Sequence, residues 1–101
     1  MTQIEQEMPI NWFVSERIET RYANNVVIQH SKNEFVISFF EILPPLLLGS
    51  PQEVQAQLQQ MRTIHAECVA RIVMSPESAQ NFARALQQNL INYQSMFGKG
   101  E

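Results

Sequence analysis

Two histidines and one cysteine, His30, His65 and Cys68, are the side chains of this 101-residue chain, apart from carboxylates and hydroxyls, that commonly bind transition metals or act as nucleophiles. His65 and Cys68 are three positions apart in a segment that alternates like a strand, so they should point to opposite faces and cannot readily chelate one ion. Cys68 belongs to the apolar row of that strand, which favours an inert core residue. We expect His65 to be a solvated or interface residue, and His30 could be buried beside the hairpin turn without a chemical role.

Three carboxylates, Glu34, Glu41 and Glu67, lie on or beside expected strands. Glu41 would either form a salt bridge with an arginine such as Arg71, or have a raised pKa in a pocket. We favour the salt bridge, because the sequence offers no second catalytic partner. An enzyme would need a pocket that gathers Glu41 or Glu67 with a histidine.

Sequence motifs for other chemistry do not occur. There is no G-x-S-x-G nucleophile motif, and the three glycines, at positions 49, 98 and 100, cannot form a phosphate-binding loop. We therefore predict a protein that is not an enzyme, with no catalytic residue, no metal site and no cofactor.

Composition and charge narrow the class of protein further. Hydrophobic residues make up 45% of the chain, which argues against disorder, and the length suits one domain. The net charge is −3 and the basic residues are scattered, so we expect no nucleic-acid partner. A single cysteine fits a reducing compartment. The N-terminus resembles no signal peptide and the longest apolar run, 42–48, is too short to cross a bilayer, so we expect a cytoplasmic protein with no membrane partner.

The clearest structural unit is a strand followed by a long helix. From Ile64 to Met74 the even positions are apolar and the odd positions are mostly polar, as in a strand with one apolar face. Ser75 is a good N-cap, Pro76 suits the first helical position, and Gly98 is a natural stop. Between them an apolar stripe repeats every three or four residues: Ala79, Phe82, Ala83, Leu86, Leu90, Tyr93 and Phe97. We expect this helix to lie along the sheet and bury its stripe.

The sequence predicts a flexible N-terminal tail over residues 1–8, followed by a single domain over 9–98. Ile10 to Val14 could form an edge strand or an extended arm, and Ser15 to Tyr22 a turn of helix. Val26 to His30 and Phe35 to Ile42 then form a β-hairpin. The second of these strands is apolar on both faces, as expected of a central strand.

The middle segment begins with Leu43 to Gly49, whose two prolines end the strand. Ser50 to Glu53 has the pattern of a capping box, and Val54, Leu58 and Met61 follow at helical spacing. We therefore predict an α+β fold: an antiparallel sheet of three to four strands packed on one long C-terminal helix, with a short middle helix. The leucines would either fill the core as a crossover, which we favour, or form an exposed apolar lip for a partner protein.

Three stretches resemble a small bacterial and archaeal family known as domain-of-unknown-function family three-four-six-seven. They are Arg21-Tyr22-Ala23-Asn24-Asn25; Glu34-Phe35 with the apolar residues after it; and Ala70-Arg71-Ile72-Val73-Met74-Ser75-Pro76-Glu77 leading to Ala85-Leu86-Gln87-Gln88-Asn89 and Tyr93. The resemblance covers about residues 20–97, and the middle segment 43–61 departs from it. The resemblance supports the predicted fold, and the family has no activity that it would imply for this chain.

One long helix can cover only one side of a sheet that is apolar on both. The N-terminal arm, the middle segment or a second copy must cover the other side. We expect a non-enzymatic homo-oligomeric interaction or scaffolding domain, a dimer, with an interface built from Trp12, Val36, Phe40, Ile42, Leu46, Leu47 and Leu48. The Leu43–Gly49 loop could also bind another protein. The alternative is a holdase similar to the SecB-like chaperones, which would bind apolar segments of unfolded clients.

Overall fold

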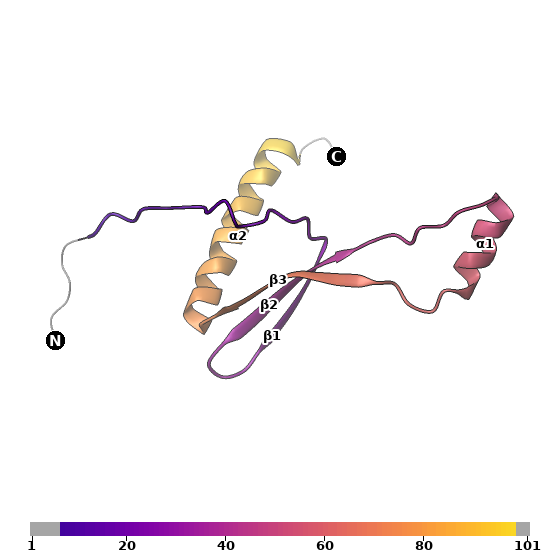
Figure 1. The fold of residues 1–101 in the computed structure, drawn as a ribbon. Coiled ribbons are helices and arrows are strands. Elements are labelled where there is room, and N and C mark those ends of the chain that lie inside the picture. The colour runs from indigo at the N-terminus through magenta and orange to yellow at the C-terminus, as the bar shows by residue number, and fades with distance from the viewer. Residues whose placement is uncertain (1–6, 99–101) are drawn as a thin grey trace.

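A computed structural model describes residues 7–98 of the chain (Figure 1). It confirms the α+β class, with a three-stranded antiparallel sheet, a short helix and a long C-terminal helix. The elements, in chain order, are β1 (Asn25–His30), β2 (Phe35–Ile42), α1 (Pro51–Gln60), β3 (Ala66–Met74) and α2 (Pro76–Phe97). Residues 1–6 of the expected flexible tail lie outside the described residues.

The sheet has the order β1-β2-β3, so β2 is the central strand, as its two apolar faces predict. A hairpin joins β1 to β2, and the Ser31 N–H donates to the Glu34 carbonyl (2.9 Å) at its turn. Ile37 lies opposite Ile28 on one side and Ile72 on the other. Within residues 7–98, Ile37 is the one buried apolar side chain, with 3% of its surface exposed. The apolar core of the sheet within one chain therefore consists of this single side chain.

A register shift interrupts the pairing of β2 with β3. Phe39 lies opposite Ala70, but Phe40 lies opposite Cys68, so Val69 is an extra residue on β3. Because side chains alternate along a strand, this extra residue changes which face the first part of β3 presents. Ala66 and Cys68 therefore share a face with Phe40, while Ala70 lies on the opposite face. The expectation of one continuous apolar row along this strand is wrong for that reason.

Helix α2 has the ends that its sequence predicts. The Ser75 hydroxyl accepts the Ser78 N–H (3.1 Å), Pro76 is the first helical residue, and the Gly98 N–H donates to the Gln94 carbonyl (2.9 Å). Its packing differs from the expectation: every residue from 80 to 97 is exposed, and the helix contacts the sheet only near its start (Figure 1). Neither this helix nor any other in the described part of the chain is long and apolar enough to cross a membrane.

The middle segment projects from the sheet with α1 at its far end (Figure 1). Two extended legs, residues 43–50 and 61–65, connect α1 to β2 and β3. The predicted capping box is present: the Glu53 N–H donates to the Ser50 hydroxyl (3.2 Å), and the Ser50 N–H donates to Glu53 Oε1 (2.7 Å). Gly49 precedes it with φ +115°, a backbone conformation that favours glycine. The Gln57 side chain donates to the Leu48 carbonyl (2.9 Å) and ties α1 to the leg before it.

The N-terminal segment is an extended arm rather than an edge strand. Instead of the expected turn of helix after Ser15, it makes a single turn closed by the Ile18 N–H and the Ser15 carbonyl (3.1 Å). The radius of gyration of the chain is 20.8 Å, with extents of 71 × 38 × 32 Å. A compact domain of this length has a radius of gyration of about 13 Å. The chain is therefore far more extended than a domain that buries its own core.

Candidate functional site: exposed apolar surfaces

The side chains that could bind a metal or act as nucleophiles are dispersed over the fold. The His30 ring stacks on Phe35, with 5.3 Å between ring centroids, and is exposed rather than buried. His65 is exposed in the segment before β3. Cys68 is exposed as well, with its Sγ 3.6 Å from the Ala70 carbonyl oxygen, so its prediction as a core residue is wrong. The reason is that β3 is an edge strand whose first half has no covering element within one chain.

The carboxylates are not arranged as predicted. Arg71 donates its Nε–H to the hydroxyl of Ser38 (3.2 Å), a side chain with 4% of its surface exposed, and does not pair with Glu41. Across residues 7–98 the one ion pair joins Arg21 to Glu19 (3.6 Å) on the surface. The same stretch holds no group of three or more histidine, cysteine or acidic residues placed to hold a metal ion.

Sequence reasoning missed the position of Glu41, which lies directly opposite Glu67. Without the extra residue Val69, the register would place Glu41 opposite Cys68 instead. Like charges at directly opposed positions are destabilising, so this pairing is expected to cost stability when both carboxylates are ionised. A bulge has no local signature in this sequence, so the juxtaposition was not predictable.

Apolar surface is the feature that stands out. Large apolar side chains are exposed on the N-terminal segment, β1, the middle segment, β3 and α2. We name three surfaces: the arm (residues 7–23), the leucine loop (Leu43–Gly49) and the α2 stripe (Phe82, Leu86, Leu90, Tyr93 and Phe97). Where exposed apolar side chains form a contiguous patch, they mark interaction sites on small proteins.

The arm combines exposed aromatic side chains with a firmly held root. Trp12 is 84% exposed and Phe13 is exposed beside it. At the root, Asn24 Oδ1 accepts the Ile42 N–H (2.8 Å), and Asn24 Nδ2 donates to the Ile42 carbonyl (3.2 Å). The Asn24 N–H also donates to the Phe40 carbonyl (3.0 Å). The amide of Asn24 thus extends the β1–β2 pairing by side-chain hydrogen bonds and sets the point from which the arm leaves the sheet.

The leucine loop does not fill the core of its own chain. Leu46 is 83% exposed, Leu48 is exposed, and Leu47 is half-buried. The favoured expectation of a buried crossover is therefore wrong within one chain, because the loop is itself part of the extended segment that leads from β2 away from the sheet to α1 (Figure 1).

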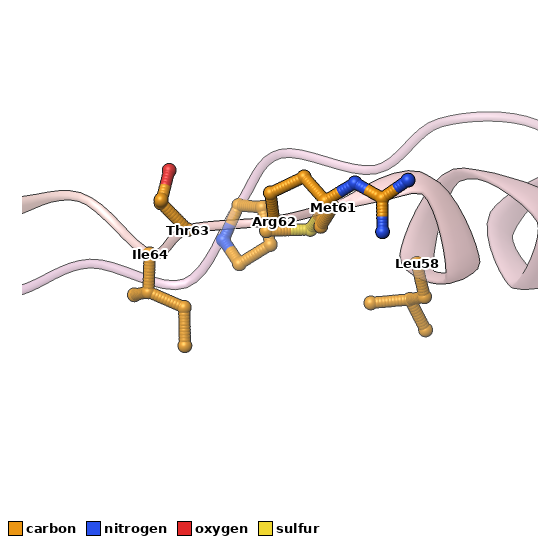
Figure 2. Close-up of a pocket in the computed structure, with 6 residues that line it drawn as sticks. Leu58, Met61, Arg62, Thr63 and Ile64 are labelled. Atoms are coloured by element: carbon orange, nitrogen blue, oxygen red, sulfur yellow. The ribbon is translucent and has the colours of Figure 1, made fainter.

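Beside the leucine loop lies an open hollow of about 490 Å³. Figure 2 shows Leu58 and Ile64 projecting to the same side of the segment, with the Arg62 side chain extending toward α1. The residues that line the hollow are Pro45, Leu58, Met61, Arg62, Thr63 and Ile64.

The α2 stripe is exposed along its length, and the rings of Tyr93 and Phe97 lie 5.3 Å apart at its end. A second hollow of about 410 Å³ lies where α2 leaves the sheet, lined by Phe35, Pro76, Ala79, Gln80 and Ala83. The stripe is readable in the sequence, but its spacing is the same for a buried core face and for an interface. The spacing alone therefore does not distinguish a stripe buried in the core from one that contacts a partner.

The predicted interface residues fall on three segments. Val36, Phe40 and Ile42 on β2 are half-buried among their strand neighbours. Trp12 lies on the arm, and the leucines lie on the loop. The structure brings the root of the arm and the start of the loop together at Ile42, through Asn24. It does not bring Trp12 onto the sheet of its own chain.

Comparison with known proteins returned one family. The sequence model of a family described as "Protein of unknown function (DUF3467)" matches residues 1–99. This is the family that the resemblance indicated, and the matched range includes the middle segment 43–61. Neither a curated protein nor a solved structure matches the chain.

Proposed function

The chain belongs to the DUF3467 family, whose description assigns no activity, and we propose that it is a homo-oligomeric protein-interaction domain that associates as a dimer. One observation carries this proposal: Ile37 is the one apolar side chain buried within residues 7–98, while large apolar side chains are exposed on nearly every segment. Hydrophobic burial is the main term that offsets the conformational entropy lost on folding. A chain with so little burial gains stability by covering these surfaces with a partner.

The amount of surface fits a second copy. One chain exposes 9602 Å². A folded monomer of this mass exposes about 5,900 Å², so the excess is about 3,700 Å². Obligate homodimers bury about 2,000–5,000 Å² in total, and more when their chains intertwine. The excess exposed surface of two chains is therefore large enough for the interface of an intertwined homodimer.

The shape of the chain supports an exchange of segments between the two copies. The arm and the leucine loop both leave the sheet near Ile42 and extend beyond it (Figure 1). In our proposal the arm and loop of each subunit cover the sheet face that carries Val36, Phe40 and Ile42 in the other. A two-fold axis makes both contacts equivalent, so each contact is made twice.

Light scattering after size exclusion, at micromolar concentration and with the full chain, tests this proposal. We expect a molar mass of twice 11.7 kDa. A mass of 11.7 kDa at every concentration, together with a well-dispersed NMR spectrum in which Phe40 is ordered, would show that one chain is stable alone. That result would refute the proposal.

A holdase similar to the SecB-like chaperones is the second candidate function. The open apolar hollow beside the leucine loop supports it, because an extended apolar segment of a client could lie there. This function predicts that the protein suppresses aggregation of a reduced, unfolding client and binds an apolar-surface dye. Absence of both effects in the associated form would exclude it and would leave the interaction domain unaffected.

A further inference from the structure

The outer edge of β1 lacks the features that protect exposed edge strands from pairing. All six residues from Asn25 to His30 are exposed, and they include no acidic residue, lysine, arginine or proline. The pairing of β1 with β2 is regular over its whole length. Natural edges are usually blocked by charges, prolines or bulges. The other edge strand, β3, has such features, namely the bulge at Val69 and the charged residues Glu67 and Arg71.

The hydrogen bonding of the hairpin determines which backbone N–H and C=O groups of β1 point outward, away from β2. The hydrogen bond from the Ser31 N–H to the Glu34 carbonyl makes these two residues a hydrogen-bonded position. In an antiparallel pair such positions alternate, so Val27 and Gln29 direct their backbone groups toward β2. The N–H and C=O groups of Val26, Ile28 and His30 therefore point away from the sheet. These three residues form an unpaired row with Ile28 at its centre.

We propose that β1 pairs in antiparallel orientation with β1 of a second copy, joining the two sheets into one of six strands. The pairing is centred on Ile28, which lies opposite Ile28 of the partner subunit. Val26 then lies opposite His30 of the partner subunit, so every outward backbone group of the row obtains a partner. This proposal rests on the proposed self-association and names the contact that organises it.

A second copy suits this edge better than a foreign strand. Antiparallel pairing about a two-fold axis places identical strands against each other, and a strand without charged residues can do so without like-charge repulsion. The excess surface of about 3,700 Å² per chain also requires a partner that covers far more than one strand, which a second copy does. On the sheet surface, the exposed side chain of Ile28 lies beside the buried Ile37, so the pairing continues the apolar face from one subunit into the next.

Amide hydrogen exchange of the unmodified full chain gives the first test. In the associated protein we expect the N–H groups of Val26, Ile28 and His30 to exchange as slowly as those of Val27 and Gln29, which bond to β2. Without edge pairing, the outward groups exchange fast while the inward groups stay protected. Fast exchange confined to Val26, Ile28 and His30 in a protein of dimeric mass would overturn the proposal.

Spin labels give the second test and identify the partner strand. In a Cys68→Ser background, labels are placed at Gln29→Cys or at Lys32→Cys, and dipolar distances are measured between subunits. The Ile28-centred register places the two Gln29 positions two residues apart along the strands, about 7 Å, and the two Lys32 positions eight residues apart, about 27 Å. Short distances at Gln29 together with distances near 27 Å at Lys32 support the pairing.

Any other pair of distances in a protein of dimeric mass overturns this register, yet leaves the proposed self-association standing. A monomeric mass instead refutes the proposed function and this inference together. The two failures are therefore distinguishable from the same samples, once the mass of each labelled variant has been measured.

Discussion

Trp12 offers the most direct test of how the apolar surfaces are used. It is the one tryptophan in the sequence, it lies on the arm, and it is 84% exposed within its own chain. If the arm covers the partner, Trp12→Ala removes an aromatic side chain from the interface in each subunit. Buried tryptophans are among the residues that contribute most to protein–protein affinity.

The expected magnitude follows from the exposed area. An exposed fraction of 84% corresponds to about 200 Å² of tryptophan surface available for burial. At about 25 cal/mol per Å², full coverage contributes about 5 kcal/mol per chain. If alanine and relaxation of the interface retain half of this, the loss is about 2.5 kcal/mol per chain and about 5 kcal/mol per dimer. Each 1.4 kcal/mol is about a tenfold change, so Kd should rise by at least about a thousandfold.

A dilution series by analytical ultracentrifugation measures Kd for the wild type, for Trp12→Ala and for the control Glu16→Ala. Glu16 is an exposed charged residue on the same arm, so its substitution should change Kd little. Wild-type tryptophan emission should shift to the red over the concentration range in which the dimer dissociates. A Kd for Trp12→Ala equal to that of the wild type, with fully solvated emission in the dimer, would refute the assignment of the arm to the interface.

Three further substitutions probe local features of the fold, each read as a change in the free energy of unfolding by urea at fixed protein concentration. Asn24→Ala removes the two side-chain hydrogen bonds to Ile42 and should cost about 1–2 kcal/mol. Ser75→Ala removes the N-cap of α2 and should cost about 1 kcal/mol. Arg71→Met leaves the buried Ser38 hydroxyl without its partner and should cost about 1–3 kcal/mol, and adding Ser38→Ala should recover part of that loss.

Matched substitutions separate these effects from a general loss of stability. Asn25→Ala, next to the hydrogen-bonded asparagine, should cost less than Asn24→Ala, and equal costs would contradict the role of the side-chain amide. Ser95→Ala, within exposed helix, should be near neutral, so a similar loss would contradict the cap. A double variant at 38 and 71 no more stable than Arg71→Met alone would show that the unpaired hydroxyl is not the cause.

The boundaries of α2 were predictable because their signals lie in adjacent residues. Ser75 and Pro76 favour a helix start, and Gly98 favours its end, whatever surrounds them. The same holds for the capping box before α1 and for the two strands of the hairpin. The central position of β2 was also predictable, since its apolar residues occur on both faces. Local conformation and the demand for apolar contact are therefore properties of this sequence.

Only the tertiary structure decided where those surfaces meet. One extra residue, Val69, moves Cys68 to another face and places Glu41 opposite Glu67, and no single-residue signal announces it. The α2 stripe has the spacing of a core face, yet it stays exposed because the helix leaves the sheet after its first turns. Hydrophobic burial is non-directional: an apolar stripe specifies that it must be covered and not by what. The cover depends on the path of the loops and on residues far away in the chain, which become neighbours only when the fold is formed.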